Sequence, residues 1–210
     1  MNNTVNVLIV DDAVTIRTLF ESIIEKSDRY SLAGSLENAN AAVPFCMRSQ
    51  VDLVLMDVYT KNRENGLEAA KEIKAKFPEI KVIIATSLPE ASFIEKAKEA
   101  GCESFWYKEM GNVGLLDICD RTMDGESVYP DATPKVDIGA ASSVDFTPSE
   151  MKVLRELCNG KLNKEIAEEL FMSENTVKFH INNMLQKAGY SNRYQLAIDA
   201  VERKLIVPGF

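Results

Sequence analysis

The chain has 210 residues, of which 46% are hydrophobic and 27% are charged. This length and composition are typical of a folded globular protein with one large domain or two modest ones. The longest purely aliphatic run, Val7–Val10, is far too short to cross a bilayer, and the first residues lack the basic start and apolar stretch of a signal peptide. We therefore expect a cytoplasmic protein with no membrane partner, whose four cysteines are reduced thiols.

The formal net charge of −8 is distributed unevenly along the chain. Residues 146–210 contain nine Lys or Arg and eight Asp or Glu, so from totals of 24 and 32 the first 145 residues hold 15 basic and 24 acidic side chains. The two parts therefore carry charges of −9 and +1, which predicts two units with different partners. A charge of +1 is by itself weak support for nucleic-acid binding.

Short aliphatic runs alternate with helical periodicity over residues 1–124. Runs such as VNVLIV and VDLVLM are apolar at nearly every position, which is typical of parallel strands buried on both faces. The predicted strands are Val5–Val10, Tyr30–Gly34, Val51–Met56, Ile80–Ala85 and Glu103–Tyr107. The predicted helices are Ala13–Lys26, Glu37–Ser49, Gly66–Phe77, Glu90–Ala100 and Asn112–Met123. These units predict an α/β domain with a doubly wound five-stranded parallel sheet, in the order 2-1-3-4-5.

Residues 125–145 contain prolines, glycines and serines without an apolar period and are predicted to form a linker. Within it, Val128–Pro130 is a candidate for packing on a neighbouring domain. Residues 146–210 then show four helical segments and no strand, which predicts a small all-α domain.

The start of each helix in this second domain has a capping signal. Thr147 begins a capping box with Pro at the first helical position. Asn163, Ser173 and Asn192 are the candidate N-caps of the next three helices, and Gly189 is expected to end the third.

Polar side chains follow four predicted strands at the points where they end. Asp11 and Asp12 end the first strand, Asp57 the third and Thr86 the fourth, and Lys108 follows the fifth. Ligands of a doubly wound sheet bind at the carboxyl ends of its strands, so we expect these groups to converge. Each alone has an ordinary structural explanation, but their joint placement is a strong signal.

Three neighbouring carboxylates repel one another and need a cation, and their oxygen ligands suit Mg²⁺. In this arrangement Asp57 would be the nucleophile that accepts a phosphoryl group.

At these residues the chain resembles the receiver domains of response regulators. The positions that match the functional residues of this family are Asp11, Asp12, Asp57, Thr86, Phe105 and Lys108. The resemblance implies that Mg²⁺ is bound by Asp12, Asp57 and the Tyr59 carbonyl, with Asp11 acting through water. It also implies that Thr86 and the aromatic switch residue Phe105 turn inward together once phosphate is present.

The stretch from Tyr59 to Gly66 departs from the pattern of this family. Relatives usually have Met-Pro at the third and fourth positions after the phosphoacceptor, and then a glycine. Here the loop has no proline, is one residue longer and carries extra positive charge. We therefore expect an unusual rate of phosphorylation or lifetime of the acyl phosphate.

The predicted third helix of the second domain has an apolar side and a polar side. Stepping 100° per residue places Ile181, Met184 and Leu185 on the side of Val177, which predicts the core face. The opposite side carries amides, lysines and one aromatic ring, which suit base edges and phosphates in a major groove. The same residues would also make an ordinary solvated face.

The segment NKEIAEELFMSENTVKFHINNMLQK resembles the LuxR-type helix-turn-helix. The resemblance implies base contacts from Lys178, Phe179 and Asn182. It also implies contacts to the DNA backbone from Thr176, Lys187, Asn163 or Lys164. A receiver followed by this domain is the plan of NarL/FixJ-type response regulators.

The resemblance implies a non-enzymatic transcription factor in which a sensor histidine kinase phosphorylates Asp57. Phosphorylation would then control homodimerisation and binding to double-stranded DNA. The linker and the charge asymmetry lead to a further hypothesis, that the acidic receiver inhibits the DNA-binding domain before phosphorylation. Two alternatives stay open. In one, the receiver responds to a protein or small molecule without phosphate. In the other, the chain is an α/β enzyme such as an aspartate-nucleophile phosphatase, although Tyr59 stands where that reaction needs a second acid. A flavin protein is disfavoured because the Asp11-Asp12 pair would repel phosphate.

Overall fold

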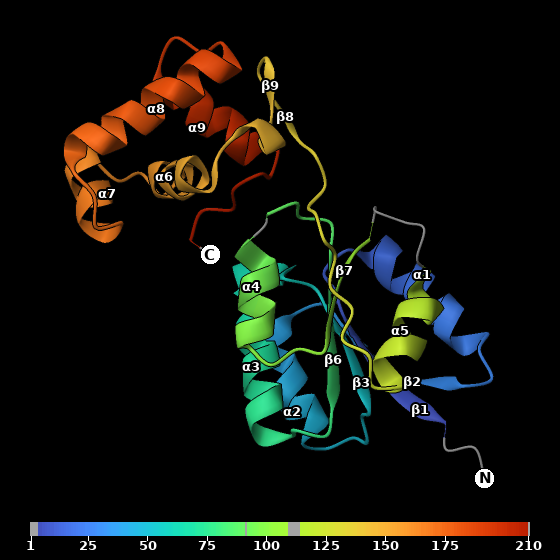
Figure 1. The fold of residues 1–210 in the computed structure, drawn as a ribbon. Helices are drawn as coiled ribbons and strands as arrows, with labels where there is room; N and C mark the ends of the chain where they lie inside the picture. The colour runs from blue at the N-terminus through green and yellow to red at the C-terminus, as the bar shows by residue number, and fades with distance from the viewer. Residues whose placement is uncertain (1–3, 91, 109–113, 210) are drawn as a thin grey trace. The chain divides into compact units, whose positions relative to one another are not determined.

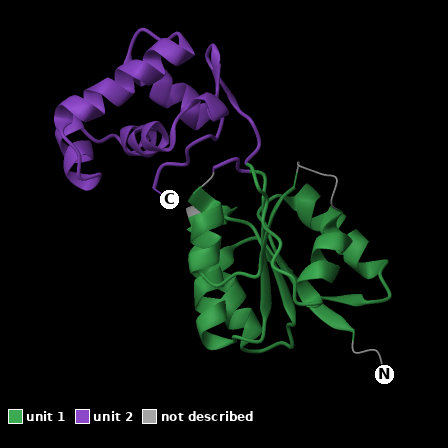
Figure 2. Ribbon diagram, in the orientation of Figure 1, with its two compact units in different colours: residues 1–87, 91–132 green, residues 88–90, 133–210 purple. Residues whose placement is uncertain are grey.

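The computed structural model describes residues 4–90, 92–108 and 114–209 (Figure 1). The chain divides into two compact units (Figure 2). Unit 1 contains residues 1–87 and 91–132, and unit 2 contains residues 88–90 and 133–210. The span predicted as a linker is therefore shared between the two units, with the division after residue 132. Within the described residues, no helix has the length and apolar character needed to span a bilayer.

Unit 1 is built on a five-stranded parallel sheet with the order β2-β1-β3-β6-β7. The strands are β1 (Val5–Val10), β2 (Tyr30–Leu36), β3 (Leu53–Met56), β6 (Lys81–Thr86) and β7 (Ser104–Tyr107). This is the predicted fold and strand order, so the fold prediction is confirmed. Nearly all residues of the three central strands are buried, as their continuous apolar runs indicate.

Helices cover both faces of this sheet (Figure 1). They are α1 (Val14–Glu25), α2 (Ala42–Cys46), α3 (Gly66–Lys76), α4 (Ser92–Glu99) and α5 (Leu115–Met123). Helices α1 and α5 pack on the face that carries Val7, Leu55 and Ile83, whereas α2, α3 and α4 cover the other face. The predicted start of α5 at residue 112 lies outside the described residues.

The predicted helix Glu37–Ser49 is wrong in its first half. The structure has a 3-10 turn, η1 (Ala39–Ala41), and then the five-residue helix α2. Pro44 lies inside α2, and a proline fits only the first turn of a helix because it lacks an N–H and crowds the preceding turn. The α-helix therefore starts just before the proline, at Ala42.

The unusual loop after Asp57 folds into a small hairpin that the sequence did not predict. Strands β4 (Tyr59–Thr60) and β5 (Glu64–Asn65) pair around the 3-10 turn η2 (Lys61–Arg63). The Thr60 side chain is fully buried, and its hydroxyl accepts a hydrogen bond from the Ala39 N–H at 3.0 Å and donates to the Glu64 carbonyl at 3.3 Å. These bonds fix the hairpin to η1.

Gly66 follows the hairpin and begins α3 in close contact with the backbone just after β3. The Gly66 N–H donates to the Val58 carbonyl at 2.9 Å. A Cβ atom at Gly66 would collide with the carbonyl oxygen of Asp57, which is backbone and cannot move aside. A glycine is therefore required here because of close approach between two backbones.

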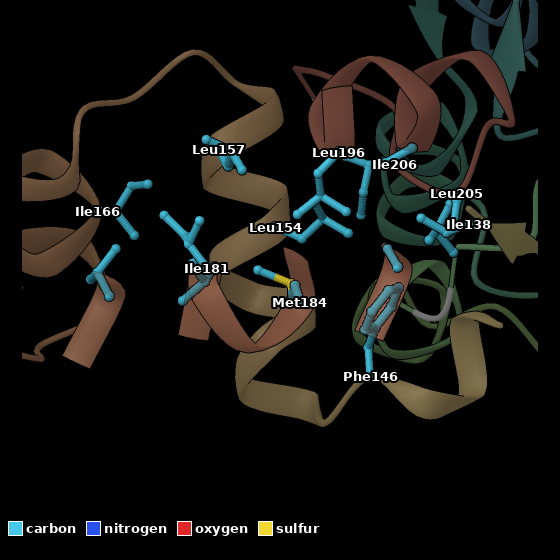
Figure 3. Close-up of a cluster of buried hydrophobic side chains, with 14 of the residues drawn as sticks. Ile138, Phe146, Leu154, Leu157, Ile166, Ile181, Met184, Leu196, Leu205 and Ile206 are labelled. Carbon is cyan, nitrogen blue, oxygen red and sulfur yellow. The ribbon is translucent and has the colours of Figure 1, made fainter. Parts of the chain in front are cut away.

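Unit 2 is a small helical domain preceded by a short hairpin. Its elements are β8 (Asp137–Ile138), β9 (Ala141–Ser142), the 3-10 turn η3 (Ser143–Asp145), α6 (Pro148–Cys158), α7 (Asn163–Glu169), α8 (Glu174–Ala188) and α9 (Arg193–Glu202). Figure 3 shows Leu154, Ile181 and Met184 among the side chains of its apolar core. The predicted four-helix architecture is confirmed, and the hairpin is an addition to it.

Three of the four predicted N-caps are present in unit 2. Thr147, Ser173 and Asn192 each accept a hydrogen bond from a backbone N–H of the first turn of their helix. The predicted cap at Asn163 is wrong, because the N-cap position of α7 is Leu162 and Asn163 is the first helical residue. The Asn163 side chain instead accepts a hydrogen bond from the Arg193 guanidinium at 2.5 Å, which links α7 to α9.

We expect Gly66→Ala to lower the free energy of unfolding by about 1–3 kcal/mol, because α3 must shift away from the Asp57 carbonyl to admit the methyl group. Urea denaturation of the full chain measures this. The matched control is Gly114→Ala, since a Cβ at Gly114 would meet no atom of the described residues within 4 Å. Equal stability of the two variants would contradict the close contact at Gly66.

Candidate phosphorylation site and recognition helix

The site at the carboxyl end of the sheet is organised around Lys108. The Lys108 ammonium donates to Asp11 Oδ2 at 2.5 Å and to Asp57 Oδ2 at 2.6 Å. Its side chain is only 6% exposed, so both ion pairs are largely shielded from water. The backbone N–H of Lys108 donates to the Thr86 carbonyl at 3.0 Å, which fixes the chain where β7 ends beside β6. The convergence that the strand ends predict is therefore present in the structure.

Asp11 uses both carboxylate oxygens within the protein. Its Oδ1 accepts a hydrogen bond from the Ala13 N–H at 2.8 Å, and its Oδ2 accepts from Lys108. The Arg17 guanidinium donates to the Asp11 carbonyl at 2.6 Å, which adds a positive group that the sequence analysis missed. The only signal for Arg17 was its position one turn into the helix that follows the acidic pair. Asp11 is therefore held rigidly as a partner of the lysine.

The electrostatics of Asp57 are dominated by burial. Burial raises the pKa of the Asp57 carboxyl above its ordinary value, the Lys108 ammonium acts in the opposite direction, and the charge of Asp11 raises the pKa further. Burial also acts to lower the pKa of Lys108, but the carboxylates of Asp57 and Asp11 outweigh it and keep that pKa raised. Lys108 therefore remains a charged ammonium, whereas burial destabilises the ionised form of the Asp57 carboxyl.

The carboxylates of Asp11, Asp12 and Asp57 could hold a metal ion, because one oxygen from each lies within 4.8 Å of the others. The Asp57 Oδ1 atom is buried and has no hydrogen-bond partner among the described residues, whereas the Oδ2 atom pairs with Lys108. Asp12 is exposed, so the cluster is open to solvent on one side. Hard oxygen ligands, excess negative charge and room for water fit Mg²⁺.

Thr86 and Phe105 lie on neighbouring strands next to this cluster. Thr86 is fully buried at the end of β6, and Phe105 on β7 is 1% exposed. The ring of Phe105 packs edge-on against Tyr107, with ring centroids 5.0 Å apart. Phe105 thus occupies the inward position that the resemblance assigns to the switch residue after phosphorylation. Tyr59, the predicted carbonyl ligand, begins β4 two residues after Asp57.

Helix α8 presents most of the predicted DNA-contacting side chains to solvent. Lys178 and Asn182 are exposed, and the Phe179 side chain is 61% exposed. Val177 and Ile181 alternate with them and are buried in the core of unit 2. A helix with polar and aromatic groups on an open face and apolar groups beneath it can enter a major groove without disturbing its own domain.

The side chains predicted to contact a DNA backbone differ in whether bonds within the protein already hold them. Lys164 is exposed. Lys187 donates to the Asp145 carbonyl at 2.9 Å and to Glu150 at 2.7 Å, so a phosphate contact would have to compete with this ion pair. Thr176 shares a hydrogen bond with the Ser173 hydroxyl at 2.8 Å, and Asn163 accepts from Arg193. Structural bonds therefore already hold three of these four side chains.

Both units match known protein families. Residues 7–120 match the response regulator receiver domain, and residues 144–200 match the bacterial regulatory proteins of the luxR family. The chain is 30% identical to the response regulator protein VraR of Staphylococcus aureus, over 97% of this chain and 99% of that protein. It is 26% identical to the uncharacterized transcriptional regulatory protein YxjL of Bacillus subtilis, over 96% of this chain and 97% of that protein.

Solved structures share the fold at lower sequence identity. RcsB from Salmonella enterica serovar Typhimurium, bound to promoter rprA in the presence of phosphomimetic BeF3⁻, is 20% identical, with a TM-score of 0.61 over 93% of this chain and 98% of that one. A structure of two RcsB dimers bound to two parallel DNAs is 21% identical, with a TM-score of 0.63 over 95% of this chain and 98% of that one. At this level of sequence identity, the structural similarity is evidence for a shared fold.

We expect Mg²⁺ to raise the melting temperature of the protein, because a cation relieves repulsion among the three carboxylates. At ten times its dissociation constant the ion would add about 1.4 kcal/mol of stability, or a shift of about 3–6 °C. Differential scanning calorimetry measures the shift, and Asp12→Asn should abolish it. The matched control is Asp117→Asn, which alters an exposed carboxylate on α5. This variant should keep the full shift in melting temperature. A shift of the same size in Asp12→Asn would rule out this metal site.

Proposed function

Because the chain belongs to the response regulators whose receiver domain is joined to a LuxR-type DNA-binding domain, we propose that phosphorylation of Asp57 by a sensor histidine kinase controls DNA binding by residues 146–210. The observation that carries this proposal is the convergence of Asp57 and Asp11 on the Lys108 ammonium, in a chain whose second unit exposes the polar face of α8. The resulting protein is a cytoplasmic transcription factor and not an enzyme.

The proposed reaction transfers a phosphoryl group to a carboxylate. One oxygen of Asp57 attacks the phosphorus, the bond from phosphorus to the histidine nitrogen of the kinase breaks, and the electron pair stays with that nitrogen. Mg²⁺, held by Asp12, Asp57 and the Tyr59 carbonyl, with Asp11 acting through water, would neutralise charge on the phosphoryl oxygens. The Lys108 ammonium already touches Asp57 and would bind a phosphoryl oxygen after transfer. The buried Thr86 hydroxyl would bind another.

The proposed output is binding of a homodimer to two half-sites on double-stranded DNA. Helix α9 buries Leu196 and Ala200 in the core but leaves Tyr194, Ile198 and Val201 exposed at 72%, 58% and 37%. These three side chains recur at helical spacing and give a second copy an apolar surface to contact. Half-sites about 34–36 Å apart would then place two copies of α8 in successive major grooves.

The rival functions are less well supported. A phosphatase of this general chemistry needs a second acid two residues after its nucleophile, and Tyr59 occupies that position. A receiver that responds without phosphate is favoured only by the altered β4–β5 hairpin, while the acceptor, the lysine and the hydroxyl are all in place. Control of the protein by phosphorylation is therefore the better-supported hypothesis.

Incubation with acetyl phosphate and Mg²⁺ should give a phosphate adduct on Asp57, detected by intact mass and located by peptide mapping. Light scattering should show a shift toward dimer in the same sample. Asp57→Asn should show neither, whereas Asp117→Asn, which alters an exposed carboxylate outside the cluster, should show both. Absence of an adduct with acetyl phosphate and with every candidate kinase would favour the phosphate-independent alternative.

We expect Lys178→Ala and Asn182→Ala each to weaken DNA binding by about 1–3 kcal/mol, because each removes a contact to base edges. A duplex selected from a random-sequence pool by the phosphorylated protein is the probe, and fluorescence anisotropy gives the dissociation constant. Lys152→Ala removes an exposed lysine of α6 and is the matched control for charge. Equal losses in Lys178→Ala and Lys152→Ala would show that only net charge matters.

A further inference from the structure

The segment that follows α5 lies along an open edge of the sheet. Strand β7 is the last in the sheet order, so one side of its backbone has no strand to pair with. The Phe105 N–H donates to the Val128 carbonyl at 2.8 Å, and the Val128 N–H donates to the Ser104 hydroxyl at 3.1 Å. Residues 126–129, here called the latch, thus take up one backbone hydrogen bond at this edge and add a second to the Ser104 side chain.

A chain of hydroxyl groups joins the latch to α5. The Ser104 and Thr122 side chains are both fully buried, and their hydroxyl oxygens lie 2.7 Å apart. The Thr122 hydroxyl donates its single proton to the Ile118 carbonyl at 2.7 Å, so the proton between the two side chains must come from Ser104. The bonds therefore run in one direction, from Val128 N–H through Ser104 and Thr122 to the Ile118 carbonyl.

Tyr129 adds a second attachment beside the first. Its hydroxyl donates to the Cys102 carbonyl at 2.7 Å, just before β7 begins. The Lys98 ammonium of α4 lies 4.8 Å from the centre of its ring, within the range of a cation–π contact. The latch therefore contacts α4, β7 and, through the hydroxyl chain, α5.

We propose that residues 126–129 act as a latch that couples the switch residue Phe105 to the tether leading to unit 2, and that phosphorylation of Asp57 tightens this latch. The proposal rests on the proposed function for the role of Asp57. Its basis is that Phe105 contributes both a buried ring beside Tyr107 and the N–H that holds Val128. The inward ring and the closed latch occur together in this structure.

The latch would set how much of the chain before residue 133 is free to move. When it is closed, the chain is held as far as Tyr129, three residues before unit 1 ends at residue 132. Opening it would add about 14 Å of extended chain for residues 126–129. That length is a large fraction of the roughly 34 Å between half-sites, so a closed latch would restrict the positions that two DNA-binding units can reach together.

Hydrogen exchange measured by NMR on the full chain tests the coupling directly. With acetyl phosphate and Mg²⁺, the amides of Phe105 and Val128 should exchange about fivefold more slowly, the change expected for strengthening one hydrogen bond. The Val5 amide, which donates to the Arg29 carbonyl at the opposite side of the sheet, is the internal control and should not change. Unchanged exchange at Phe105 and Val128 in protein shown by mass to be phosphorylated would overturn the proposal.

Variants test whether the latch affects the response of DNA binding to phosphorylation. Thr122→Val removes the central hydroxyl at nearly constant volume and Thr122→Ser retains it, while Tyr129→Phe removes the second attachment. Tyr30→Phe is the matched control, because it removes a tyrosine hydroxyl that donates to Asp120 at 2.8 Å, away from the latch. Phosphorylation should strengthen binding to the selected duplex in the wild type, Thr122→Ser and Tyr30→Phe. In Thr122→Val and Tyr129→Phe the strengthening should fall about fivefold, with normal adduct formation.

The outcomes separate the two proposals. If the wild type forms no adduct, or its adduct does not alter DNA binding, the proposed function fails, and exchange at Val128 in the presence of beryllofluoride still decides whether the latch responds to the site. If the wild type responds but Thr122→Val and Tyr129→Phe keep its full response, the latch proposal fails alone.

Discussion

The interaction on which the receiver unit depends is the pair of ion pairs from Lys108 to Asp11 and Asp57. The ammonium between them allows two ionised carboxylates to lie this close inside the protein, and their charges in turn compensate the buried lysine. This requirement fixes where β1, β3 and β7 must end relative to one another. On the other side of Asp57, the close approach of α3 to the Asp57 carbonyl requires a glycine as the first residue of that helix.

The same cluster is suited to respond to a small covalent change. Phosphorylation would replace the single negative charge of the Asp57 carboxylate by a phosphoryl group of about −1.5 to −2 charges, where one ammonium already serves two buried carboxylates. The added negative charge would be stabilised by neighbouring groups that can donate a hydrogen bond to it. The buried hydroxyl of Thr86 is such a group, and its strand pairs with the strand that carries Phe105.

Most of the fold and of the candidate site could be predicted from the sequence, because both depend on strong local patterns. Continuous apolar strands defined the sheet, and Asp57, Thr86 and Lys108 were found because polar residues end those strands. The features that were missed depend on contacts distant in sequence. The β4–β5 hairpin is fixed by Thr60 bonding to Ala39, and Asn163 is drawn away from its helix cap by Arg193. No periodicity encodes such contacts.

The segment at residues 126–129 also bears on how the protein behaves at high concentration. An uncovered terminal strand is a template on which another chain can extend the sheet, and this is a common route to aggregation. Here the Phe105 N–H is already satisfied by the Val128 carbonyl, so that part of the β7 edge cannot recruit a foreign strand. The segment that leads out of the first unit therefore also covers one position of its exposed sheet edge.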